Sequence, residues 1–263
     1  LLDWLAIEFQ EKGWDLRVLI KMMVMSATYR QSSALNDNSL QDPENIYLSR
    51  GPSYRLQMEM IRDNALAASG LLNRKIGGPS VKPYQPEGLW KEKNEFSGFL
   101  RVYQPDSGEN LYRRSLYTFI RRTSPPPVMT TFDLPSRDVC NVKRERTNTP
   151  LQALALLNEP LFVEASKVLA IRMQREVKDN IEAKNAFGFR QLCGRDPTII
   201  ERAAMLTQYQ KAYQKFSKDP TNAKKLLSIG EYPVPGDLDP VQTASLTLVA
   251  NMIMNFDEFY MKR

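Results

Sequence analysis

The sequence predicts a mainly α-helical domain: an irregular multi-helix assembly with long ordered loops that are rich in proline, glycine and aromatic residues. Apolar residues recur at helical spacing in the first 30 residues, in residues 53–73 and in most of the chain after Thr149. Residues 75–104 contain many helix breakers and several aromatic side chains, and disordered segments rarely carry so many aromatics. Residues 128–146 form a second irregular run, so two ordered loops are expected among the helices.

Two helices are expected at the start of the chain, over residues 1–10 and 15–30. Gly13 is a suitable end for the first helix, and Asp15 is placed to cap the second. Because the connection is short, we expect the two helices to pack as an antiparallel pair. A third helix over residues 53–73 is expected to bury a stripe made of Leu56, Met60, Ala67 and Leu71.

Further helices are predicted in the central and C-terminal segments from apolar spacing and capping residues. Residues 110–123 fit an amphipathic helix, or a strand over residues 115–121, before a run of three prolines. Thr149 is placed as an N-cap, with Gln152 able to complete a capping box. This helix is expected to bury Leu151, Leu154 and Ala155, and further helices are expected over residues 159–177, 181–192, 198–216 and 220–227 and from Pro240 onwards.

Length and patterning favour a single domain over residues 1–263, and a division into a helical half 1–135 and a helical bundle 136–263 is the alternative. The chain opens on Leu1 rather than methionine, so we expect a fragment of a larger protein. No apolar run approaches the roughly 20 residues that span a bilayer, and no membrane span is expected.

Composition excludes several kinds of site. The net charge is +6, and the basic residues cluster only in pairs, which disfavours a nucleic-acid interface. The chain has no histidine, which removes the commonest general base and the usual zinc ligand, and no metal site is predicted. Cys140 and Cys193 are expected to be two separate thiols, with a disulfide between them left open.

Charged side chains provide the candidate site. Two readings stand side by side: carboxylates and arginines that line a ligand cleft, or internal ion pairs that fix the loops against the helices. Arginines bind oxyanions in a bidentate manner, which supports the first reading. The candidates are Arg55, Glu59, Arg62 and Asp63 in the third helical segment, and Asp133, Arg137, Arg144, Glu145 and Arg146 in the second loop.

Aromatic residues of the first loop provide a second set of candidates. Tyr84, Trp90 and Tyr103 could stack on sugar rings, and Phe96 and Phe99 lie in the same loop. A long ordered loop within a compact domain often carries function, which favours a ligand-binding role for this segment.

Several motifs together resemble one known family. Its name is the planctomycete domain of unknown function DUF1553, also called PSD1. The motifs are Leu1-Leu-Asp-Trp-Leu-Ala6, Ser26-Ala-Thr-Tyr-Arg-Gln-Ser32, Asp42-Pro-Glu-Asn45, Met60-Ile-Arg-Asp63, Ser69-Gly-Leu-Leu72, Ile76-Gly-Gly-Pro-Ser-Val-Lys-Pro-Tyr84, Leu111-Tyr-Arg-Arg-Ser-Leu-Tyr117, residues 131–137 and residues 144–158.

The resemblance implies a context rather than a reaction. Such domains usually form the C-terminal part of large exported bacterial proteins, after a cytochrome c-like domain and a DUF1549 domain. These upstream domains are the expected partners, and the expected location is periplasmic or secreted. Haem c would belong to the upstream part, and no cofactor is expected in this chain. The family has no established activity, so no catalytic residue is carried over and the enzyme question stays open.

Two functions are therefore expected from the sequence. The first is an accessory or ligand-binding module of an exported, multi-domain cytochrome c-type protein. The alternative is the substrate-binding or catalytic part of an enzyme that acts on polysaccharide or another polymer, with carboxylates and arginines in the working roles because histidine is absent.

Overall fold

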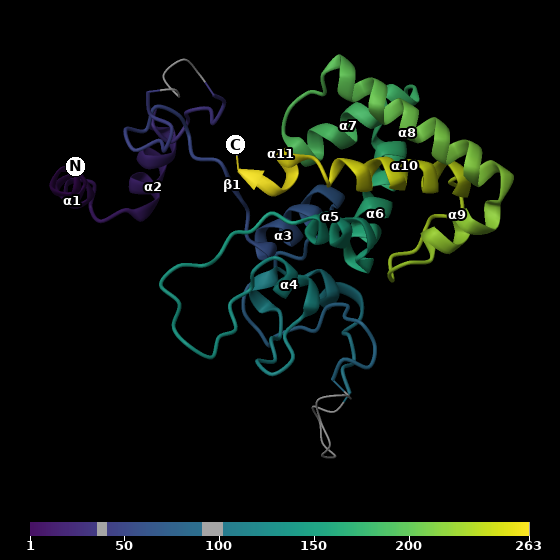
Figure 1. The fold of residues 1–263 in the computed structure, drawn as a ribbon, viewed down its shortest axis with the longest axis horizontal. Helices are drawn as coiled ribbons and strands as arrows, with labels where there is room; N and C mark the ends of the chain where they lie inside the picture. Colours follow the sequence, from purple (N-terminus) through teal and green to yellow (C-terminus); the bar gives the residue numbers. More distant parts are fainter. Residues whose placement is uncertain (36–40, 91–101, 263) are drawn as a thin grey trace. The chain divides into compact units, whose positions relative to one another are not determined.

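A computed structural model describes residues 1–35, 41–90 and 102–262 of the chain and confirms the predicted mainly α-helical class (Figure 1). In these ranges the sheet is limited to two short strands that pair with each other, β1 (Tyr54–Arg55) and β2 (Met261–Lys262). The chain divides into two compact units, residues 1–54 with 261–263 and residues 55–260. The alternative boundary at 135/136 falls within the second unit.

The first unit begins with the two expected helices, α1 (Leu2–Glu11) and α2 (Leu16–Met25), which contact each other. The Asp15 side chain accepts a hydrogen bond from the Arg17 amide at 2.8 Å, which confirms the predicted cap. Helix α2 ends at Met25, earlier than expected, and no residue of α1 or α2 is buried within the described chain.

Helix α3 (Met58–Ser69) and helix α6 (Pro160–Glu176) pack together at the centre of the second unit. The predicted face of α3 is wrong: Met60 is 53% exposed, and Met58, Ile61 and Ala65 form the buried face instead. The reason is that Arg62, expected on a charged outer face, is turned inward to hydrogen-bond with backbone carbonyls of another segment. Tertiary partners therefore decided which face of α3 is buried.

The C-terminal helices form a bundle around α10 (Pro240–Ile253), which contacts α6 and all three helices between them (Figure 1). Most predicted helix starts here are confirmed by side-chain caps from Asn180, Thr198, Asp219 and Asp239. The other helices are α7 (Ile181–Cys193), α8 (Ile199–Lys218), α9 (Pro220–Leu227) and α11 (Asp257–Tyr260). No helix of the described chain is both long enough and apolar enough to cross a membrane.

The helix expected over residues 110–123 is wrong. Two 3-10 turns, η2 (Gly108–Tyr112) and η3 (Ser115–Tyr117), occupy this stretch, followed by the short helix α4 (Pro127–Thr131). The carbonyl oxygens of Leu111 and Arg113 accept hydrogen bonds from the Arg62 guanidinium at 2.6 and 2.8 Å. Those carbonyls therefore have a partner from α3 rather than from a helix of their own.

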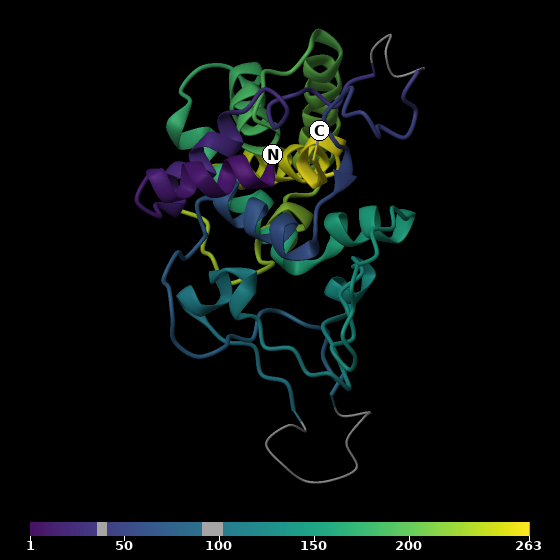
Figure 2. The same ribbon diagram turned by 90° about the vertical axis from the view of Figure 1, so that its left-hand side faces the viewer.

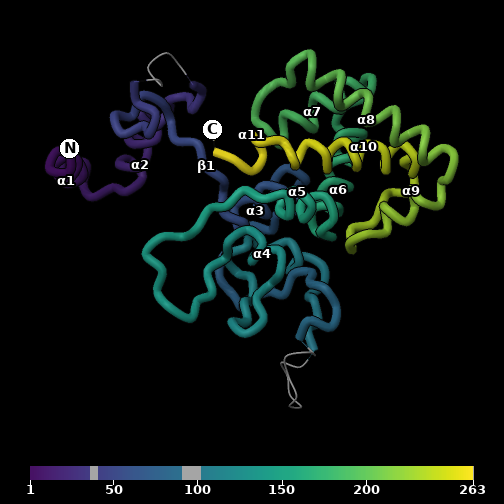
Figure 3. Tube along the Cα trace, viewed as in Figure 1, coloured from purple at the N-terminus to yellow at the C-terminus, as the bar shows by residue number. Residues whose placement is uncertain are grey.

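The segments between α3 and α5 (Pro150–Asn158) lie on one side of the helices in both views of the second unit (Figures 1 and 2). Figure 3 shows the wide irregular loop that joins α4 to α5. The capping box at the start of α5 is confirmed: Gln152 Oε1 accepts a hydrogen bond from the Thr149 amide at 3.3 Å. The predicted buried stripe is wrong, because Leu151 and Leu154 are 58% and 55% exposed.

Helix α6 carries two ionisable residues into the interior. Glu164 is fully buried, and its Oε1 accepts hydrogen bonds from the Tyr112 hydroxyl at 2.9 Å and from the Tyr232 amide at 2.7 Å. Lys167 Nζ donates to the carbonyl of Ile229 at 2.7 Å, and burial lowers its pKa despite the nearby Glu164. The two side chains thereby fix the loop that follows α9.

Gly230 in this loop should be intolerant of a side chain. Its φ of +79° is unfavourable for other residues, and an added Cβ would collide with the Glu164 side chain. We expect Gly230→Ala to lower the free energy of unfolding by about 1–3 kcal/mol in urea titrations. Gly236→Ala is the matched control, since nothing lies within 4 Å of its Cβ position. Equal stability of the two variants would contradict the packing of this loop on Glu164.

Candidate functional site

Arg55 ties the start of α3 to the loop between α4 and α5. Its side chain is buried, and Nη2 forms an ion pair with Asp133 Oδ2. The same guanidinium donates to the backbone carbonyls of Thr147 at 2.6 Å, Leu56 at 2.7 Å and Phe132 at 3.3 Å. Every nitrogen of Arg55 therefore has a partner within the chain, so this arginine serves mainly to fix the loop.

Asp133 closes the base of that loop. Its carboxylate accepts hydrogen bonds from the Thr147 amide at 2.7 Å and from the Thr147 hydroxyl at 3.0 Å. Burial alone would raise its pKa, but the bonds from Thr147 and Arg55 outweigh burial and hold the pKa of Asp133 below its ordinary value. Its backbone has a φ of +60°, which the surrounding hydrogen bonds maintain.

Arg62 and Asp63 form an ion pair at the edge of the distance range, and both side chains also hold the 3-10 turns. Burial lowers the pKa of Arg62 to about 10, which leaves it protonated near neutral pH. Asp63 Oδ1 accepts hydrogen bonds from both the amide and the hydroxyl of Ser115 at 2.8 Å, and lies 3.7 Å from Arg62 Nη1. Both side chains serve as anchors for the backbone of η3.

Arg144 and Glu59 form the third link between the loop and α3. Arg144 Nη1 lies 3.0 Å from Glu59 Oε1, and its Nε donates to the Asp133 carbonyl at 3.0 Å. The second atoms of both groups, Glu59 Oε2 and Arg144 Nη2, are buried without a hydrogen-bond partner in the part of the chain that the structure describes. The hydrogen bonding of this pair is therefore only half-satisfied.

The remaining predicted residues do not join these pairs. Glu145 lines a recess of about 260 Å³ beside Arg144, and Arg146 is exposed. Arg137 is exposed and lines a separate cavity of about 420 Å³, which we call the charged groove. The groove is lined by Gln57, Glu59, Met60, Asp63, Asn64, Arg114, Ser115, Leu116, Ile120 and Arg137.

Six of the nine predicted charged residues form salt bridges with one another within the described residues, and a ligand-binding role for the set stays a prediction. The paired residues are Arg55 with Asp133, Arg62 with Asp63, and Arg144 with Glu59. Sequence patterning did not identify Arg114, because it was grouped with a helix that does not form.

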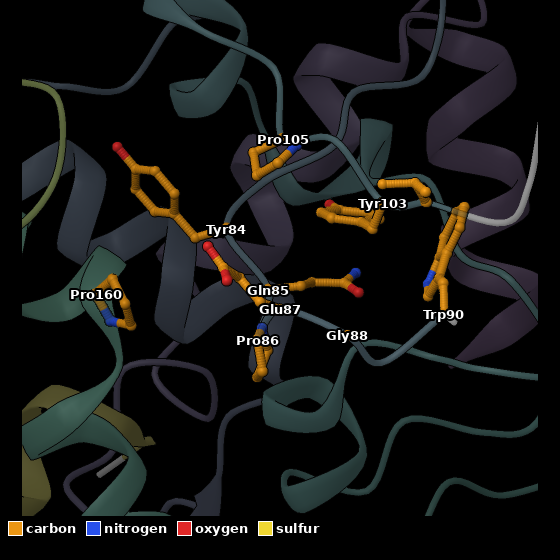
Figure 4. Close-up of a pocket in the computed structure, with 10 residues that line it drawn as sticks. Tyr84, Gln85, Pro86, Glu87, Gly88, Trp90, Tyr103, Pro105 and Pro160 are labelled. Carbon is orange, nitrogen blue, oxygen red and sulfur yellow. The ribbon is translucent and has the colours of Figure 1, made fainter. Parts of the chain in front are cut away.

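A second cavity, also of about 420 Å³, gathers the aromatic residues of the first loop. Figure 4 shows Tyr84 at one end of this aromatic pocket, Trp90 at the other and Tyr103 between them. Phe96 and Phe99 lie outside the described residues. The pocket is lined by Tyr84, Gln85, Pro86, Glu87, Gly88, Trp90, Val102, Tyr103, Pro105 and Pro160.

Trp90 is held firmly in the wall of the aromatic pocket. Only 1% of its surface is exposed, and its ring meets Tyr103 edge-to-face with centroids 4.9 Å apart. The guanidinium carbon of Arg121 lies 5.1 Å from the Trp90 ring centroid. Tyr103 is fixed in turn, since its hydroxyl donates to the Pro83 carbonyl. These contacts give the pocket a preformed aromatic wall.

Two polar atoms of the aromatic pocket have no partner among the described residues. Trp90 Nε1 is a buried donor and Gln85 Oε1 is a buried acceptor. In Figure 4 the Gln85 amide extends from the centre of the pocket toward Trp90. A buried polar group without a hydrogen bond is unfavourable by about 1–3 kcal/mol, so both atoms favour a ligand or water that bonds to them.

Tyr84 connects the aromatic pocket to the interior. Its hydroxyl accepts a hydrogen bond from the Glu231 amide at 3.0 Å, and burial, with the nearby Glu164, raises its pKa. The Tyr84 ring also lines a narrow cleft that contains Glu159. Burial raises the pKa of the Glu159 carboxyl from its ordinary 4.5 to about 7.

Sequence patterning did not identify Glu159, because a glutamate just before a helix-starting proline has no distinctive pattern. Its altered pKa comes from tertiary burial alone.

Both cysteines are free in the structure, with Cys140 exposed. In residues 1–35, 41–90 and 102–262, no three cysteine, aspartate or glutamate side chains gather into a group that could hold a metal ion.

Removal of Arg55 should show that its pair with Asp133 is structural. We expect Arg55→Met to lower the free energy of unfolding by about 3–5 kcal/mol, because Asp133 loses its cationic partner. Arg122→Met, at an exposed position, should change stability by no more than about 0.5 kcal/mol. The double variant Arg55→Met/Asp133→Asn should be less destabilised than the sum of the single changes. Strict additivity in a double-mutant cycle would contradict the pairing.

Glu159 should make stability depend on pH. Its folded pKa of about 7 exceeds its ordinary value of 4.5, so the folded state binds more protons between these values. Its favourable contribution is complete below pH 4.5 and is lost as pH rises to about 7. We therefore expect Glu159→Gln to raise the free energy of unfolding above pH 7 by about 1–3 kcal/mol, with little effect below pH 4.5.

Urea titrations from pH 4 to 8 measure this effect, with Glu87→Gln as the matched control at an exposed glutamate of the aromatic pocket. A Glu159→Gln curve parallel to that of the unsubstituted protein over the whole range would show that Glu159 is not the responsible group.

Comparison with known proteins gives the family of this chain. The family model described as PSD1, protein of unknown function (DUF1553), matches residues 1–209. Neither the curated proteins nor the solved structures contain a match to the chain. The matched range holds every residue of the aromatic pocket and of the charged groove. The chain belongs to the DUF1553 (PSD1) family, as its motifs predicted.

Proposed function

We propose that this chain is a ligand-binding module whose aromatic pocket holds a neutral, polyhydroxylated ring such as a sugar unit of a polysaccharide. One observation carries the proposal: Trp90 Nε1 and Gln85 Oε1 are buried, without partners among the described residues, in a pocket walled by aromatic side chains. The first atom donates a hydrogen bond and the second accepts one.

A sugar hydroxyl suits this pair of atoms because one hydroxyl can accept from the indole N–H and donate to the amide oxygen. The CH faces of a sugar ring are apolar and pack against aromatic rings, of which Tyr84 and Tyr103 supply two that are partly exposed. The cavity of about 420 Å³ lies within the usual range for small-molecule sites. Ligand chemistry and pocket size therefore point to the same class.

The proposal extends to the parent protein. We place this module in an exported, multi-domain protein whose cytochrome c-like and DUF1549 domains precede it, as the family resemblance implies. In that setting the module would hold a carbohydrate beside the upstream redox domain, and haem c would belong to that domain. Loss of carbohydrate-dependent haem reduction on deletion of this region would support the arrangement.

Glu159 favours a second function, in which the module takes part in polymer cleavage. A carboxyl with a pKa of about 7 can donate and accept protons near neutral pH, as a general acid must. Glu159 lines the cleft that shares Tyr84 with the aromatic pocket. Polysaccharide hydrolysis that is abolished by Glu159→Gln while ligand binding is retained would establish this function.

Calorimetric titration with a panel of neutral oligosaccharides tests the binding proposal. We expect Trp90→Phe, which keeps an aromatic ring and removes the N–H donor, to weaken binding about 5- to 10-fold. Gln85→Met, which removes the acceptor, should weaken it by a similar factor. Trp14→Phe is the matched control, because Trp14 is 64% exposed and lies in the other unit.

Thermal unfolding by circular dichroism would first show that each variant is folded. The proposal fails if no oligosaccharide binds, or if Trp90→Phe and Trp14→Phe bind equally well.

A further inference from the structure

The two carboxylates of the charged groove are already paired within the chain. Glu59 Oε1 lies 3.0 Å from Arg144 Nη1. Asp63 Oδ1 receives two hydrogen bonds from Ser115 and lies 3.7 Å from Arg62 Nη1. The negative charge on this wall is therefore compensated by arginines that belong to the internal framework.

The two arginines of the groove are in the opposite situation. Arg114 and Arg137 are exposed, and neither guanidinium group has a hydrogen bond or ion pair with the residues that the structure describes. With both carboxylates compensated, the two guanidinium groups leave uncancelled positive charge at the cavity. This imbalance favours an anionic ligand.

Arg137 is held at the groove by the framework described above. The loop that carries it is fixed at one end by the Asp133–Thr147 hydrogen bonds and again by the Arg144–Glu59 pair. Its φ of +63° is uncommon for a residue with a side chain and costs about 1–3 kcal/mol, which the rest of the structure must offset. Such conformations concentrate at ligand-binding positions, which agrees with a binding role for Arg137.

The groove also offers apolar surface. Met60 is 53% exposed and Leu116 is 73% exposed, and both line the cavity. A bare inorganic ion would leave this surface in water, whereas the body of an organic ligand could cover it. The volume of about 420 Å³ accommodates a molecule rather than a single ion.

We propose that the charged groove is a second binding site, which takes the oxyanion group of an organic ligand through Arg114 and Arg137. Guanidinium groups bind carboxylate and phosphate oxygens through paired N–H donors, which gives the site its selectivity for charge. Met60 and Leu116 contact the body of the ligand. The site shares no lining residue with the aromatic pocket and does not rest on the carbohydrate proposal.

Calorimetric titration at low ionic strength tests this site with four probes: glucuronate, glucose 6-phosphate, glucose and inorganic phosphate. We expect glucuronate or glucose 6-phosphate to bind at least 10-fold more tightly than glucose. The stronger of the two identifies the oxyanion as a carboxylate or a phosphate ester. Binding should weaken as salt is added, because the ligand contacts are ionic and exposed.

Three variants make the test specific. Arg114→Gln and Arg137→Gln should each weaken binding of the preferred probe at least 5-fold. Arg74→Gln should leave binding of that probe unchanged. This substitution removes the same charge, but the exposed Arg74 does not line the groove. Weakening of the preferred probe by Trp90→Phe to the same degree as by Arg137→Gln would place the anion in the aromatic pocket and overturn the assignment to the groove.

The proposal is overturned if both anionic sugars bind no better than glucose. It is also overturned if Arg74→Gln weakens binding as much as Arg137→Gln, since the attraction would then come from net surface charge. Inorganic phosphate that binds as tightly as glucose 6-phosphate would overturn the role given to Met60 and Leu116.

Discussion

The irregular half of the second unit depends on buried guanidinium groups that hydrogen-bond to backbone carbonyls. A chain without helices or strands must still satisfy its buried polar atoms, and here side chains do so alongside backbone bonds such as that from the Val81 amide to the Tyr117 carbonyl. Arg62 reaches two carbonyls of the η2–η3 segment, and Arg113 reaches three carbonyls of the Gly-Gly-Pro loop, at Lys75, Gly77 and Pro79. Arg55 does the same for the loop after α4. Arginine suits this task because its planar group carries several donors in fixed directions.

This framework explains why both cavities lie where they do. The aromatic pocket is lined largely by residues from the segments between α3 and α5, whose backbone the arginines hold in place. The charged groove is lined by residues of these segments together with residues of α3 and its N-cap. A rigid loop presents side chains to a ligand without a large loss of conformational freedom on binding. The helices supply the apolar core of this unit, and α6 and α10 both contribute residues to it. The buried faces of these helices are mostly apolar, so they offer few polar side chains to a ligand.

Agreement between sequence and structure was greatest where local signals determine the outcome. The starts of α2, α5, α8 and α10 follow from capping side chains that act within a few residues. The aromatic residues at Tyr84, Trp90 and Tyr103 were recognised from composition, and they do line one cavity. The buried face of α3 was missed, since apolar spacing alone gave no reason to bury Arg62 in place of Met60.

The sequence by itself determined the helical class, most of the helix starts and the absence of histidine chemistry, because these depend on neighbouring residues and composition. Only the tertiary structure decided which charged side chains form ion pairs inside the protein. Arg55, Arg62, Arg137 and Arg144 look alike along the chain, yet three are paired inside the protein and Arg137 lines an open cavity. Whether an arginine is used internally depends on distant partners. Arg55 binds Thr147, which is 92 positions away, and Arg62 binds Leu111, which is 49 positions away. No local pattern encodes contacts at that separation.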